Sequence, residues 1–127
     1  MAYTFLKAKG IDVGGSRVEN HKIKHAQRVL ERCESRGVAV LLPTDHAVAA
    51  ALNEDAETQV VTEIPEKLMG LDIGPETIAA YSAAIADAGT IFWNGPMGVF
   101  EMDAFANGTK MVAEAVAASK GYSVIGG

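Results

Sequence analysis

The chain has 127 residues, of which 49% are hydrophobic and 21% charged, so it is long enough to bury the core of one ordinary domain. Its formal net charge is −5 and it contains no basic run, which argues against nucleic acid or an anionic membrane surface as a partner. The single cysteine, Cys33, excludes an internal disulfide, and no apolar run approaches the roughly 20 residues of a membrane span. We therefore expect a cytoplasmic protein that binds neither nucleic acid nor membranes.

Both ends of the chain have the pattern of internal segments. Residues 2–8 show the apolar spacing of a helix that stops at Gly10, but no capping residue precedes them. At the other end, an apolar strand at 123–125 leads into Gly126 and Gly127, as in the turn that opens an α/β phosphate-binding site, and no helix follows. We expect a piece of a longer protein; the alternative is a frayed natural terminus.

Helices and strands are predicted to alternate between these ends. Further helices are expected at 19–36, 75–88 and 107–120, where amphipathic spacing or terminal Pro and Gly signals occur. The apolar runs at 38–43 and 90–93 predict buried strands, 58–64 predicts a shorter one, and 46–52 fits either a strand or a helical turn. Strands separated by helices imply a parallel sheet with helices on its faces, and we expect the 19–36 helix to lie on that sheet.

Ligands of such sheets bind outside the carboxyl ends of the strands. Three glycine-rich segments are expected there: MGLDIGP at 69–75, NGPMGVFE at 94–101 and the final pair at 126–127. Leu71, Val99 and Phe100 would offer flat apolar contact to a base. Glu101 could accept hydrogen bonds from ribose hydroxyls. This combination favours a nucleoside, although glycines after strands are also ordinary turn residues.

Several motifs together resemble one known family. The stretches MAYTFLKAKG, LLPTD, MGLDIGP, WNGPMGVFE with FANGTK, and the terminal IGG occur in the order and approximate spacing of phosphoglycerate kinases. The resemblance covers essentially all of residues 1–127 and implies a Rossmann-like, three-layer α/β domain. It implies that this is the partial C-terminal, nucleotide-binding domain of a monomeric two-domain glycolytic enzyme, truncated at both ends. That family transfers a phosphoryl group between 1,3-bisphosphoglycerate and ADP, giving 3-phosphoglycerate and ATP with magnesium.

The resemblance also assigns expected nucleotide contacts. Gly70 and Leu71 would line the adenine pocket, Asn94 would lie toward the phosphates, and Glu101 would hold the ribose hydroxyls. Gly98, Val99 and Phe100 would complete the wall against base and sugar. The full set of expected nucleotide-binding residues is Gly70, Leu71, Asn94, Gly95, Pro96, Gly98, Val99, Phe100, Glu101, Gly126 and Gly127.

The same resemblance limits what this chain would do alone. The magnesium ligand of the family's Gly-Gly-Gly-Asp turn would follow Gly127, and the phosphoglycerate would bind to another lobe. We therefore assign no catalytic residue and no metal ligand to these residues, and expect no turnover and only millimolar or unmeasurable ADP or ATP binding by the isolated chain. Phosphoryl transfer depends on positioning and on cations facing the phosphoryl oxygens, which are not supplied here.

Two other functions remain as alternatives. A dinucleotide-dependent oxidoreductase would also have glycine loops on a parallel sheet, but it would require a G-x-G-x-x-G fingerprint that the sequence lacks. A non-catalytic nucleotide-binding or interaction module derived from the kinase fold is the second.

Trp93 is interpreted as packing against the helix that follows it, and His21 and His25 as solvated residues of a helix face.

Overall fold

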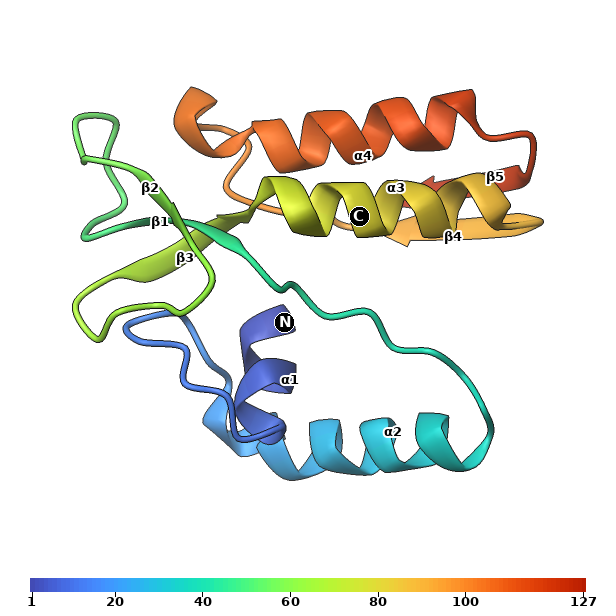
Figure 1. The fold of residues 1–127 in the computed structure, drawn as a ribbon, viewed down its shortest axis with the longest axis horizontal. Coiled ribbons are helices and arrows are strands. Elements are labelled where there is room, and N and C mark those ends of the chain that lie inside the picture. Colours follow the sequence, from blue (N-terminus) through green and yellow to red (C-terminus); the bar gives the residue numbers. More distant parts are fainter.

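The computed structural model describes residues 1–127 and has a mixed α/β architecture (Figure 1). The helices are α1 (Ala2–Ala8), α2 (Ile23–Ser35), α3 (Pro75–Asp87) and α4 (Asn107–Ala118), with short 3-10 helices η1 (Asn20–Lys22) and η2 (Asp103–Phe105). The strands are β1 (His46–Ala49), β2 (Gln59–Val61), β3 (Met69–Ile73), β4 (Thr90–Asn94) and β5 (Tyr122–Gly126). The predicted α/β class is confirmed, and the four predicted α-helices are present.

The strands form two separate sheets of opposite type. In the first, with order β2-β1-β3, both pairings are antiparallel, whereas β4 and β5 pair in parallel. The expectation of a parallel sheet therefore holds for β4 and β5 and is wrong for β1 to β3. The reason lies in the connections: residues 50–58 contain no helix and join β1 to its antiparallel neighbour β2, whereas parallel neighbours would need a longer crossover. Residues 62–68, also without a helix, connect β2 to β3 on the other side of β1, so β1 is antiparallel to both. Helix α4 joins β4 to β5 and permits the parallel crossover.

Helices α3 and α4 lie side by side and cover one face of the β4–β5 pair (Figure 1). Their shared core contains Ile73 from β3, Ile78 from α3, and Val112 and Val116 from α4, all buried. Trp93 of β4 packs against this cluster, as the sequence indicated. None of the helices combines the length and apolarity that a membrane crossing requires.

Three sequence expectations about strands and loops are wrong. Residues 38–43 form no strand and run as an extended, largely exposed connection from α2 to β1 (Figure 1). Residues 69–73, expected to belong to a loop, are strand β3, and only Gly74 follows it before α3. Strand β4 is present but not buried, since Phe92 is 73% exposed. Apolar runs show that a segment can be buried, but burial also requires a neighbouring strand or helix.

Helix α2 also departs from expectation, because it contacts α1 rather than a sheet. Only Ala26 of its apolar face is buried, and Cys33 is half-buried. Gly37 follows with a φ of +68°, which fits the predicted glycine stop. An amphipathic pattern predicts that a helix face is covered but does not specify the covering element.

Two buried aspartates, one just before β1 and one in β3, accept hydrogen bonds from the N-termini of helices. The carboxylate of Asp45 accepts hydrogen bonds from the backbone amides of Glu76 and Thr77, both at 2.8 Å, and from the Thr77 hydroxyl at 2.6 Å. Burial alone would raise the pKa of Asp45, but these hydrogen bonds lower it overall. Asp72 accepts a 2.8 Å hydrogen bond from the Gly108 amide at the start of α4. Both carboxylates satisfy amides that a helix leaves unpaired.

Candidate nucleotide site

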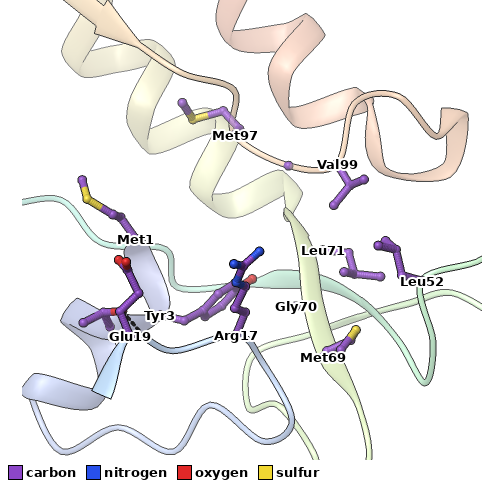
Figure 2. Close-up of a pocket in the computed structure, with 12 residues that line it drawn as sticks. Met1, Tyr3, Arg17, Glu19, Leu52, Met69, Gly70, Leu71, Met97 and Val99 are labelled. Carbon is purple, nitrogen blue, oxygen red and sulfur yellow. Dashed lines mark hydrogen bonds between the residues drawn. The ribbon is translucent and has the colours of Figure 1, made fainter. Parts of the chain in front are cut away.

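A cavity of about 500 Å³ lies between α1, β3 and the loop after β4 (Figure 2). Most of its lining is apolar, with two charged side chains at one side. The lining residues are Met1, Tyr3, Thr4, Arg17, Glu19, Leu52, Met69, Gly70, Leu71, Met97, Gly98 and Val99. Its size and mainly apolar walls are those of a small-molecule pocket.

The contact between Gly70 and Tyr3 closes one side of this cavity. A Cβ atom at position 70 would overlap the Tyr3 ring, so glycine allows the ring to lie against the strand. The Tyr3 hydroxyl lies 3.3 Å from Nδ1 of His46, within hydrogen-bonding distance. Burial raises the pKa of Tyr3 and lowers the pKa of His46, so both side chains are neutral at pH 7. Helix α1 is thereby held on the first sheet.

The opposite wall joins β3 to the WNGPMGVFE loop. The Val99 amide donates a 2.9 Å hydrogen bond to the Leu71 carbonyl, which brings the two expected motifs into contact. Glycine is needed at position 98, where a Cβ atom would lie 2.5 Å from the Leu71 carbonyl and 2.6 Å from Oδ1 of Asp72. The loop is also anchored to α4, because the Met97 amide donates to Oγ1 of Thr109 at 3.1 Å.

Asp72 lies directly behind this wall. Its Oδ1 accepts from the Ile73 amide at 2.9 Å, and its Oδ2 accepts from the Gly108 amide. Burial raises the pKa of Asp72, and the two amides oppose that shift without cancelling it. The side chain is 3% exposed and does not line the cavity, so its role is to join β3, the loop and α4.

A second, smaller cavity of about 190 Å³ lies at the ends of β4 and β5. Its lining residues are Trp93, Gly95, Pro96, Phe100, Thr109, Ile125, Gly126 and Gly127. The Gly95 amide donates a 3.2 Å hydrogen bond to the Gly126 carbonyl. Gly95 and Gly127 have backbone φ values of +92° and +102°, which residues other than glycine rarely adopt. The two strand ends therefore approach each other through glycine backbone.

The structure divides the expected contact residues between the two cavities. Gly70, Leu71, Gly98 and Val99 line the larger one, whereas Gly95, Pro96, Phe100, Gly126 and Gly127 line the smaller one. Phe100 is thus separated from Val99, with which it was expected to form one wall. Asn94 and Glu101 line neither cavity, although Oδ1 of Asn94 lies beside the Gly127 backbone.

Sequence reasoning missed several lining residues. Tyr3 and Leu52 carried no ligand signal, and Met69 begins the MGLDIGP segment but was not among the expected contact residues. Arg17 follows a Gly-Gly-Ser turn in a segment that showed no recognised motif. Thr109 belongs to the FANGTK stretch, whose spacing from the loop was the one available indication of a shared site. No three His, Cys, Asp or Glu residues come together as a metal-binding set.

Comparison with known proteins identifies the family. The sequence profile of phosphoglycerate kinase matches residues 1–127. The chain belongs to the phosphoglycerate kinase family. A phosphoglycerate kinase of Bdellovibrio bacteriovorus is 50% identical over 129 residues, covering 100% of this chain and 32% of that protein. A phosphoglycerate kinase of Anaeromyxobacter dehalogenans is 54% identical over 129 residues, covering 100% of this chain and 33% of its own length.

Solved phosphoglycerate kinases share the fold. The structure of the Coxiella burnetii enzyme matches with a TM-score of 0.97 at 44% identity, covering 99% of this chain and 33% of that one. The Pyrococcus horikoshii enzyme matches with a TM-score of 0.83 at 32% identity, with the same coverage. The chain therefore spans about a third of the length of the phosphoglycerate kinases it matches.

Proposed function

We propose that the full-length protein is a phosphoglycerate kinase and that residues 1–127 supply the adenosine side of its ADP and ATP site. The observation that carries this proposal is the larger cavity. Leu71 and Val99 come from two separate motifs, are joined by a hydrogen bond, and line the same apolar space. The reaction would be reversible phosphoryl transfer between 1,3-bisphosphoglycerate and ADP, giving 3-phosphoglycerate and ATP.

The larger cavity has the chemistry of a base-binding site. Leu71 and Val99 give aliphatic contact, and Gly70 and Gly98 contribute half-buried backbone to the lining. A planar base between such walls loses water from both faces, which is the main source of affinity in apolar pockets. We place the ribose toward the exposed carboxylate of Glu101, whose oxygens can accept from hydroxyl groups.

We place the phosphates at the smaller cavity. Gly95 and Gly127 put backbone without side chains at its surface, and Asn94 lies beside them with an amide that can donate hydrogen bonds. Glycine-rich strand ends of this kind form concave surfaces for anions. The role of this chain would be to hold and orient the nucleotide so that its terminal phosphate projects beyond these residues.

The groups that act on the transferred phosphoryl are proposed to lie outside residues 1–127. Phosphoryl transfer requires cations facing the equatorial oxygens, and Mg²⁺ supplies much of this charge when it is bound with the nucleotide. The phosphoglycerate is likewise proposed to bind to another lobe. We therefore expect no turnover by the isolated chain.

The isolated chain should also bind nucleotide weakly. Adenosine has about 19 non-hydrogen atoms, and at roughly 0.3 kcal/mol per atom a complete pocket would supply about 6 kcal/mol, a Kd in the tens of micromolar. With part of the site absent, we expect a millimolar Kd or no measurable binding. We further propose a monomeric, cytoplasmic parent protein that binds neither nucleic acid nor membranes.

The direct test is a coupled assay of ATP formation by the full-length protein with 1,3-bisphosphoglycerate and ADP. Val99→Asp should raise the KM for ADP more than tenfold, because it places a charge against the base. Val38→Asp, at a 56% exposed position outside the cavity, is the matched control and should leave KM unchanged. A full-length protein that binds ATP without turnover would instead be the non-catalytic module, and one that does neither would overturn the proposal.

A further inference from the structure

Arg17 occupies a position in the larger cavity to which the proposed function assigns no role. It is the only cationic residue of the lining, and Glu19 is the only anionic one. Figure 2 shows its side chain extending from the 14–19 segment into the space between Tyr3 and the Leu71 side of the cavity. The guanidinium therefore lies beside the space that we assign to the base.

The backbone around Arg17 is fixed on both sides. The Gly15 amide donates a 2.8 Å hydrogen bond to the Leu68 carbonyl, and the hydroxyl of buried Ser16 accepts one from the Gly70 amide at 2.9 Å. Two residues beyond Arg17, the Glu19 amide donates to Oγ1 of Thr4 at 3.1 Å. Arg17 is thus held between β3 and α1, which form two sides of the cavity.

The guanidinium has no protein partner. The structure contains one salt bridge, between Lys22 and Glu19, and no side-chain hydrogen bond involves Arg17. The exposed Arg17 side chain therefore keeps its planar face and its donors available to a ligand. A guanidinium is planar and weakly hydrated, and it stacks on aromatic rings more readily than an ammonium group does.

We propose that Arg17 binds the nucleobase by stacking its guanidinium on the face opposite Leu71 and Val99. This inference rests on the proposed function, because it requires a base in the larger cavity. The purine then lies between aliphatic groups on one face and a planar cation on the other. Arg17 contributes affinity at the base and makes no contact with the phosphates, which are assigned to the strand ends near Gly95 and Gly127.

The experiment compares binding of adenosine, AMP, ADP and ATP to the full-length protein by calorimetry. Arg17→Leu should weaken all four by the same factor, roughly two- to tenfold, because the lost contact is to the base that they share. Arg17→Lys keeps the positive charge but replaces the planar guanidinium by an ammonium group, so most of the loss of affinity seen in Arg17→Leu should remain. Arg28→Leu removes an exposed arginine of α2 outside the cavity and should leave all four affinities unchanged. Thermal unfolding of each variant checks that it is folded.

Each other outcome has a separate meaning. A loss that grows from adenosine to ATP would overturn base stacking in favour of a phosphate contact. Full affinity in Arg17→Lys, or unchanged affinity in both Arg17 variants, would also overturn it while leaving the proposed nucleotide site intact. A wild-type protein that binds none of the four ligands would overturn the proposed function itself, and this inference with it.

Discussion

The two sheets of this chain differ in how far they are buried. In the first sheet, Val48 and Ala49 of β1 are fully buried, and Phe105 packs against β3 with no exposed surface. In the second, every residue of β5 is exposed and Phe92 of β4 is 73% exposed. Both sheets have apolar sequences, so composition does not explain the contrast. In the first sheet β1 and β3 are covered by packed side chains, although β2 is largely exposed, whereas α3 and α4 cover only one face of the second.

This contrast separates the two halves of the proposed site. The base-side cavity uses β3, which belongs to the buried sheet and is locked to the loop through Val99 and Gly98. The phosphate-side cavity is formed by the ends of the exposed pair. We expect residues 1–127 to preserve the geometry of the base site more firmly than that of the phosphate site.

The largest expected effect comes from the same substitution at two phenylalanines. Phe105→Ala should lower the free energy of unfolding of residues 1–127 by about 3–5 kcal/mol, since it empties a fully buried position. Phe92→Ala should change it by less than about 0.5 kcal/mol, because most of that ring is already in water. Urea titrations of both variants measure the difference. Equal losses would show that the second sheet is as well covered as the first.

A smaller effect is expected where the loop meets β3. Gly98→Ala places a methyl group against the Leu71 carbonyl and Asp72, and should cost about 1–3 kcal/mol of unfolding free energy. It should also weaken nucleotide binding by the full-length protein, because the wall moves. Gly89→Ala is the matched control, since a Cβ atom there meets nothing within 4 Å. If both substitutions are tolerated equally, the wall is not closely packed.

The stability contributed by the hydrogen bonds between the Asp45 carboxylate and the start of α3 should depend on pH. The pKa of Asp45 is lowered in the folded chain, so its stabilising contribution is complete above the ordinary value of 3.8 and is lost as pH falls through the folded pKa. Asp45→Asn should cost about 1–2 kcal/mol at pH 7, as for a lost helix cap, and the difference from wild type should shrink below about pH 4. Unfolding measured from pH 3 to 7 gives the profile.

Substitution of Asp72 should give the opposite dependence of stability on pH. Its pKa is raised by burial, so its contribution to stability falls as pH rises from 3.8 through the folded pKa. Asp72→Asn should therefore gain stability relative to wild type over that window, opposite in sign to Asp45→Asn. Profiles with the same sign would show that the environments of the two carboxylates are wrongly described.

The smallest effect on stability concerns the open face of the second sheet. Exposed strand edges and apolar surface favour pairing with another copy, so residues 1–127 alone should self-associate at high concentration. Phe92→Lys should reduce that association while changing the unfolding free energy by less than about 0.5 kcal/mol. Size-exclusion chromatography with light scattering measures both proteins. A wild-type fragment that stays monomeric at high concentration contradicts this expectation.

Local signals predicted the helices well. Pro75 begins α3 because proline suits the first helical turn, a preference that does not depend on the rest of the fold. Gly10 and Gly37 follow α1 and α2 with positive φ values, whereas Gly89 has none and α3 ends through the extended Ala88. Pro75, Gly10 and Gly37 constrain the backbone by themselves, so the sequence alone was sufficient.

Strand pairing and exposure could not be predicted in the same way. The run at 38–43 is as apolar as a buried strand, yet no neighbouring strand pairs with it. Residues 69–73 have two polar or glycine positions, which suggested a loop, but pairing with β1 makes them a strand. Arg17 was missed because its place in the cavity depends on Ser16 contacting Gly70 across the fold. Each of these features is set by contacts between distant segments.

The central claim is that the cavity between Leu71 and Val99 holds the base of ADP and ATP. Methyl-resolved NMR of the full-length protein during an ADP titration tests it most directly, because both side chains carry methyl groups at the cavity wall. The account predicts saturating shifts at Leu71 and Val99, with Val38 unaffected. Saturable ADP binding that leaves the Leu71 and Val99 methyl signals unchanged would contradict it.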